Sequence, residues 1–200
     1  VMYTEAMQHG KIWFDEAKDS VNSIDYYSLG SCYLGLSQFD EAFDNYAKIS
    51  NCTDYFVSQM DGQIRQTLDK NIDVLKGERR FKDALNLYKL FMDKYPSSDK
   101  AYMLYQYSSI YRDWQETLQG DEKLSVISEM FKVYDQLETE FPTWDNLHYV
   151  LYTHARWTYA YFDPENTQCL AEPLYQKLYD YCTTKEEQTD QLKSMEIEAC

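Results

Sequence analysis

The segments that decide the fold are Tyr26-x2-Leu29-Gly30-x2-Tyr33 and, shortly after it, Ala42-x3-Tyr46. Within each segment the large side chains recur at intervals of three or four residues, which is the spacing of one face of an α-helix. Gly30 and Ala42 are small, so two antiparallel helices can approach closely there, while the tyrosines and Leu29 fill the groove between them. The pattern predicts a tightly packed helix pair.

The second half of this pattern recurs further along the chain. The copies are Phe81-Lys82-Asp83-Ala84-x3-Tyr88-x7-Pro96, Met130-x3-Tyr134-x7-Pro142 and Ala171-x3-Tyr175. The equivalent tyrosines, at positions 46, 88, 134 and 175, are separated by 42, 46 and 41 positions. Self-similarity at such a period is typical of helical-repeat proteins, in which each repeat buries its apolar face against its neighbours.

Apolar spacing of the i, i+3, i+4, i+7 kind extends over nearly the whole chain and predicts helices almost throughout. We expect them at about 2–18, 25–36, 39–49, 54–76, 81–95, 99–118, 122–141, 144–162 and 170–182. Pro173 must lie in the first turn of the last of these helices. The sequence holds only six Gly and four Pro, and no linker is visible. We therefore predict a single domain over 1–200, with an N-terminal helix in 1–22, repeats in 23–183 and a capping helix in 184–200.

The helix pair at positions 26–46 resembles the tetratricopeptide repeat, whose pattern is W-x2-L-G-x2-Y followed by A-x3-F. Tyr replaces Trp at position 26 and Phe at position 46, and the repeats exceed the usual length of about 34 residues. The resemblance implies an all-α, right-handed superhelical solenoid of antiparallel helix pairs, with about four repeats that have long first helices. HEAT and armadillo arrays, with repeats of about 40–47 residues, are the alternative architecture. The tyrosine-rich, acidic character is also similar to repeat proteins of the Bacteroidetes cell envelope.

The composition narrows the range of partners. Nineteen Lys and Arg stand against 34 Asp and Glu, which gives a net charge of −15. A surface of that sign repels phosphate, so nucleic acid and anionic membranes are poor partners. No stretch approaches the roughly 18–20 consecutive apolar residues that a membrane-spanning helix needs, so we expect no membrane insertion. The compartment stays open between the cytoplasm and a bacterial periplasm or envelope.

Two aromatic stripes are candidate binding residues. Tyr107, Tyr111 and Trp114 recur at i, i+4 and i+7 on one predicted helix. Tyr152, Arg156 and Tyr159 recur in the same way on the next helix of the first-position type. First helices line the inner surface of such solenoids, so the stripes predict an aromatic, hydrogen-bonding groove there. Packing against the second helix of each pair is the alternative interpretation.

Two further candidates follow from the family resemblance. Members that clamp the C-terminal carboxylate of heat-shock chaperones carry Lys one turn before the Gly and Asn directly after it. Here these positions hold Tyr27 and Ser31, which lack the ammonium and amide groups that would bind the carboxylate. We expect binding residues at these positions but not that clamp.

Little in the sequence indicates catalysis or a cofactor. His9, His148 and His154 are the only histidines, and the last two lie about 240° apart around a helix, so they do not face one ligand. No nucleophile pattern, phosphate loop or zinc signature is present. Five cysteines form no C-x-x-C pair. We therefore expect no metal, no cofactor and no enzyme activity.

The sequence thus favours a protein–protein interaction scaffold that binds a partner peptide or helix on its concave face. The alternative is a solute-binding or sensor module that recognises a glycan or small ligand through the aromatic groove.

Overall fold

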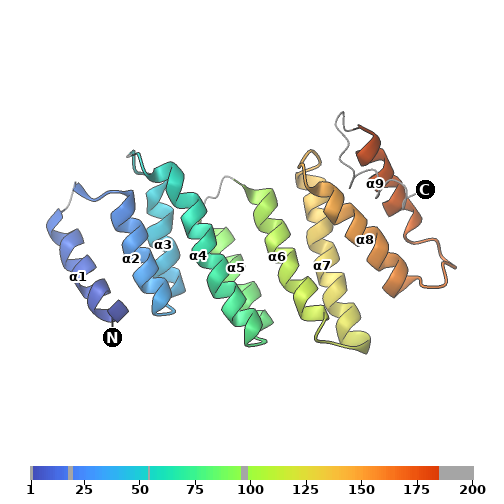
Figure 1. Cartoon of the computed structure of the whole chain (residues 1–200), viewed down its shortest axis with the longest axis horizontal. Helices are drawn as coiled ribbons and strands as arrows, with labels where there is room; N and C mark the ends of the chain where they lie inside the picture. Colours follow the sequence, from blue (N-terminus) through green and yellow to red (C-terminus); the bar gives the residue numbers. More distant parts are fainter. Residues whose placement is uncertain (1, 18–19, 54, 96–98, 185–200) are drawn as a thin grey trace. The chain divides into compact units, whose positions relative to one another are not determined.

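The computed structural model describes residues 2–17, 20–53, 55–95 and 99–184, and this part of the chain is all-α (Figure 1). Its helices are α1 (Met2–Ala17), α2 (Ser23–Gly35), α3 (Phe39–Ile49), α4 (Val57–Gly77), α5 (Phe81–Lys94), α6 (Lys100–Gln115), α7 (Gly120–Glu140), α8 (Leu147–Phe162) and α9 (Glu172–Thr184). The prediction of an all-α fold is confirmed. The predicted capping helix, 184–200, falls almost wholly outside the described residues.

The chain forms two compact units, residues 1–100 and 101–200. The sequence shows no linker between them, and one continuous superhelical solenoid over 1–200 stays a prediction. No described helix has the length and apolar character that crossing a membrane requires.

Helices α2 and α3 form the closely packed pair that the sequence predicts. A Cβ atom at Gly30 would lie 2.5 Å from Cε1 of Tyr46 and 3.0 Å from the carbonyl oxygen of Ala42. Tyr46 is 1% exposed, and its hydroxyl lies 3.1 Å from Ser31 Oγ. Burial raises the pKa of this hydroxyl to about 12, although the hydrogen bond with Ser31 acts to lower it. The absence of a side chain at Gly30 therefore sets how near the two helices come.

The second pair, α4 and α5, continues the first in the manner of tandem repeats. Besides pairing with each other, α4 packs on α2, and α5 packs on α3. Phe43 of α3 and Phe91 of α5 meet edge to face with ring centroids 5.2 Å apart, and both are fully buried. At the surface, Lys94 Nζ bridges Asp40 and Asp44 at 2.8 and 2.9 Å. Equivalent helices of successive pairs thus lie together in this unit.

In the second unit, α8 packs between α7 and α9. The core of the second unit is built from buried side chains: Ala101, Ile127, Met130, Tyr134, Leu137, Leu147, Val150, Leu151, Leu178 and Cys182. The Tyr134 hydroxyl has a pKa raised to about 12, chiefly by burial, while hydrogen bonds with Ser108 of α6 and Thr153 of α8 act to lower it. Tyr134 therefore ties three helices together.

The connection between α8 and α9 is organised by the carboxylate of Asp163, which is 3% exposed. Its oxygens accept from the backbone N–H groups of Thr167, Gln168 and Leu170 at 2.9, 3.1 and 3.2 Å. Burial alone would raise the pKa of Asp163, but these donors outweigh it and hold the pKa below its usual value. Pro173 lies in the first turn of α9, as predicted.

Candidate functional site

The aromatic stripe predicted on α6 is half-buried. Tyr107 and Tyr111 meet edge to face at 5.6 Å, and their hydroxyl oxygens lie 3.3 Å apart. Tyr111 packs against the core of the second unit, and burial, followed by the hydrogen bond with Tyr107, raises its pKa. Trp114 is also half-buried. Much of this stripe therefore contributes to packing.

The three residues predicted on α8 have different surroundings. Tyr152 packs against the core, and Arg156, which is exposed, donates from Nη1 to the Tyr152 hydroxyl at 3.2 Å. The guanidinium also lies over the Tyr152 ring, 5.8 Å from its centroid. Tyr159 is 44% exposed and lines a separate cleft.

The cleft beside Tyr159 lies where α8, the loop after it and α9 meet. It has a volume of about 540 Å³ and opens to solvent. We call it the tyrosine cleft, and its lining residues are Tyr159, Asn166, Ala171, Glu172, Tyr175, Gln176 and Tyr179. Three tyrosine rings from two helices are thus combined with two side-chain amides and a carboxylate. Such a surface can stack on a planar or cationic group and hydrogen-bond its edges.

Tyr27 and Ser31 belong to the packing of the first helix pair. The ring of Tyr27 stacks on that of Tyr46 at 5.9 Å, and its hydroxyl lies 3.4 Å from Thr67 Oγ1 of α4. Ser31 pairs with the Tyr46 hydroxyl. A role in binding remains a prediction for both residues, which are half-buried.

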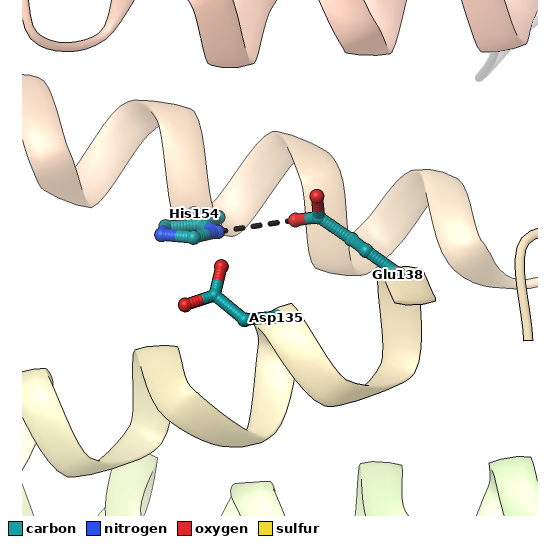
Figure 2. Close-up of side chains that lie close together, drawn as sticks. All are labelled: Asp135, Glu138 and His154. Atoms are coloured by element: carbon teal, nitrogen blue, oxygen red, sulfur yellow. Dashed lines mark hydrogen bonds and ion pairs between the residues drawn. The ribbon is translucent and has the colours of Figure 1, made fainter. Parts of the chain in front are cut away.

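A second polar cluster lies between α7 and α8 and contains Asp135, Glu138 and His154 (Figure 2). His154 Nδ1 lies 3.2 Å from Glu138 Oε1, with both side chains largely buried at 8% and 11% exposure. The other oxygen, Oε2, accepts from Lys177 Nζ of α9 at 2.7 Å. Desolvation acts to raise the pKa of Glu138, but the hydrogen bonds from His154 and Lys177 outweigh it and lower the pKa. Glu138 therefore stays ionised and links three helices.

Asp135 extends this cluster toward solvent. It lies one turn before Glu138 on α7, and Figure 2 shows its carboxylate directed toward the His154 ring. One potential ligand atom from each of the three residues lies within 4.8 Å of the other two. Imidazole nitrogen and carboxylate oxygen are the donors that Zn²⁺ and similar ions take in proteins.

Sequence reasoning missed both of these sites in part. Tyr175 and Tyr179 stand four positions apart on one helix, a spacing that could have indicated an aromatic face of that helix, but nothing in the spacing points to Tyr159 on α8. From the sequence, His154 was compared only with His148, and its contact with Glu138 was not predicted. The two residues are 16 positions apart on different helices, so no local sequence pattern links them. His148 has other surroundings, with Nδ1 3.0 Å from the carbonyl oxygen of Asp145.

Comparison with known proteins gives little further information. No family model matches the chain, and no curated protein matches it. Among solved structures, the C-terminal part of a tetratricopeptide repeat-containing protein from Cytophaga hutchinsonii is similar over 98% of this chain and 80% of that one. The identity is 17% and the TM-score 0.34. The helical-repeat interpretation therefore rests on the helix pairs of this chain itself.

Proposed function

We propose that this chain is a protein-interaction scaffold and that the tyrosine cleft holds a basic segment of a partner peptide. The observation that carries the proposal is the convergence of Tyr159, Tyr175 and Tyr179 on one open cleft. Aromatic faces attract Lys and Arg side chains, each contact being worth about 0.5–2 kcal/mol depending on how far it is desolvated.

Charge favours the same kind of partner. Glu172 lies in the lining of the tyrosine cleft, and the chain as a whole carries a net charge of −15. An acidic surface steers basic peptides toward it and repels acidic ones. On the same helix as Tyr159, the guanidinium of Arg156 lies over the Tyr152 ring. This cation–π contact within the chain is of the kind that an Arg of a bound peptide would make.

The test is a titration of the full chain with fluorescently labelled peptides of matched length that are basic, neutral or acidic. We expect saturable binding of basic peptides, weakened by added salt and reduced about tenfold by Tyr159→Ala. Tyr159→Phe, which keeps the ring, should retain most of the affinity. Tyr55→Ala is the matched control, because Tyr55 is 79% exposed and lies outside the cleft.

A glycan or other small polar ligand is the second candidate, since Asn166, Glu172 and Gln176 place hydrogen-bonding groups beside the tyrosine rings. The same titration with soluble glycans distinguishes the two. Saturable glycan binding that Tyr159→Ala abolishes, with no response to any peptide, would replace the scaffold by the solute-binding function. Peptide binding that is equal in Tyr159→Ala and Tyr55→Ala would show that the tyrosine cleft does not hold the peptide.

Binding on a concave face, and the contribution of the stripes on α6 and α8, remain predictions from the sequence. Tyr107→Ala and Trp114→Ala, measured in the same titration, test whether a peptide extends beyond the cleft onto α6.

A further inference from the structure

The cluster of Asp135, Glu138 and His154 has the donor set of a transition-metal site. It combines one buried imidazole, one largely buried carboxylate and one exposed carboxylate, supplied by two adjacent helices (Figure 2). Because Glu138 and Asp135 are one turn apart on α7, both reach the same side of the helix, where His154 of α8 faces them.

The distance between the donor atoms of His154 and Glu138 already suits a bound ion. Zn²⁺ takes nitrogen at about 2.0–2.1 Å and carboxylate oxygen at about 2.0–2.2 Å, so two such bonds near the tetrahedral angle separate their donor atoms by about 3.3 Å. His154 Nδ1 and Glu138 Oε1 lie 3.2 Å apart. Asp135 also offers a carboxylate oxygen within 4.8 Å of one ligand atom of each of these two residues, and a turn of its exposed side chain would bring that oxygen closer.

The surroundings hold the imidazole and Glu138 in place. The His154 ring packs on Phe131 with centroids 4.3 Å apart and lies 5.9 Å from the ring of Tyr134. Lys177 binds Glu138 through Oε2 and leaves Oε1 directed at the histidine. A partner on the far oxygen of a ligating carboxylate is the kind of outer contact that orients metal ligands.

We propose that Asp135, Glu138 and His154 bind a divalent transition-metal ion of the Zn²⁺ type between α7 and α8. The ion takes the place of the proton between Nδ1 and Oε1, and the neutral imidazole that binds it carries its single ring proton on Nε2, so a neutral ring changes tautomer without net loss of a proton. Three protein ligands leave one position of a tetrahedral ion for water. Mg²⁺ and Ca²⁺ fit less well, since both prefer shells of six or more oxygen atoms and neither favours imidazole.

The test uses the full chain, freed of metal by a chelator and titrated with Zn²⁺ by calorimetry and with Co²⁺ by visible absorption. We expect one ion per chain, a tetrahedral cobalt spectrum and a higher melting temperature with Zn²⁺. Asp135→Asn should weaken binding at least about tenfold, because loss of even an outer partner of a metal ligand costs about 10–100-fold. Glu129→Gln, an exposed change on the same helix, is the matched control and should bind as wild type.

Because His154 is buried and its replacement risks unfolding, the exposed Asp135 decides the outcome. His154→Gln is scored only in chains that keep the wild-type circular dichroism spectrum. The proposal is overturned if the chain binds neither ion. It is also overturned if Asp135→Asn and Glu129→Gln bind the ion with the same affinity. A cobalt spectrum dominated by thiolate charge transfer would assign the ion to cysteine, with Cys169 the exposed thiol among the described residues, and would also overturn it.

Discussion

Gly30 is the residue at which the first helix pair is most sensitive to change. An alanine there would gain up to about 1 kcal/mol in helix propensity. The added Cβ, however, would lie 2.5 Å from Tyr46 Cε1 and 3.0 Å from the backbone oxygen of Ala42, and Tyr46 is fully buried. We expect Gly30→Ala to lower the free energy of unfolding by about 1–3 kcal/mol, measured by urea denaturation.

Gly62 is the matched control for Gly30, because it lies inside α4 and a Cβ there meets nothing within 4 Å. Gly62→Ala should stabilise the chain by up to about 1 kcal/mol through helix propensity alone. Equal effects of the two substitutions would mean that the close approach of α2 and α3 does not limit the residue at position 30.

Residues also show where sequence reasoning ends. Gly30 could be interpreted before the structure because its neighbours Leu29 and Tyr33 form a repeating pattern with it. Glu138 could not, because its partners His154 and Lys177 are 16 and 39 positions away on other helices. Their meeting depends on how α7, α8 and α9 pack, and apolar periodicity does not give that arrangement.

Helices were predicted well because nearly every one carries a long apolar stripe, and the errors are at their ends. α2 begins at Ser23 rather than 25 because Asn22 and Asp25 form a reciprocal capping box. α8 begins at Leu147 rather than 144, and Trp144 lies in the turn before it, with its ring 5.6 Å from that of Tyr105. Side-chain caps and tertiary contacts set these ends.

The turn at Trp144 is linked to α9 by Tyr181. The Tyr181 hydroxyl donates to the Trp144 carbonyl oxygen at 2.7 Å. Tyr181→Phe keeps the ring and removes this donor, so we expect a loss of about 1 kcal/mol in the free energy of unfolding, measured by urea denaturation. Tyr3→Phe, an exposed change on α1, controls for the substitution itself. A Tyr181→Phe chain as stable as wild type would mean that water satisfies the carbonyl equally well.

The loop between α8 and α9 should respond to acid through Asp163. Its pKa is lowered in the folded chain, so its ionised form contributes stability that is complete above the ordinary value of 3.8 and is lost as the pH falls through the folded pKa. Asp163→Asn should lower the melting temperature at neutral pH, with a gap to wild type that narrows below about pH 4. Melting curves from pH 7 to pH 2 measure this. A gap that stays constant over that range would contradict a contribution from the ionised carboxylate.

Each of the two compact units has its own buried core, and in the first unit the packing follows the order of neighbouring helix pairs. In repeat proteins, stability is close to a sum of terms within repeats and between nearest neighbours, so a local defect has local effects. We therefore expect Gly30→Ala to speed amide exchange in α2, α3 and the adjacent α4 and α5, while α7, α8 and α9 keep wild-type protection. Hydrogen exchange followed by mass spectrometry measures this helix by helix.

An equal increase in exchange rate in all of these helices would show one cooperative unit over the whole chain, and it would favour the continuous solenoid that the sequence predicts. Faster exchange confined to the first unit would show that residues 1–100 open without residues 101–200, so a partner bound at the tyrosine cleft would stabilise the second unit alone.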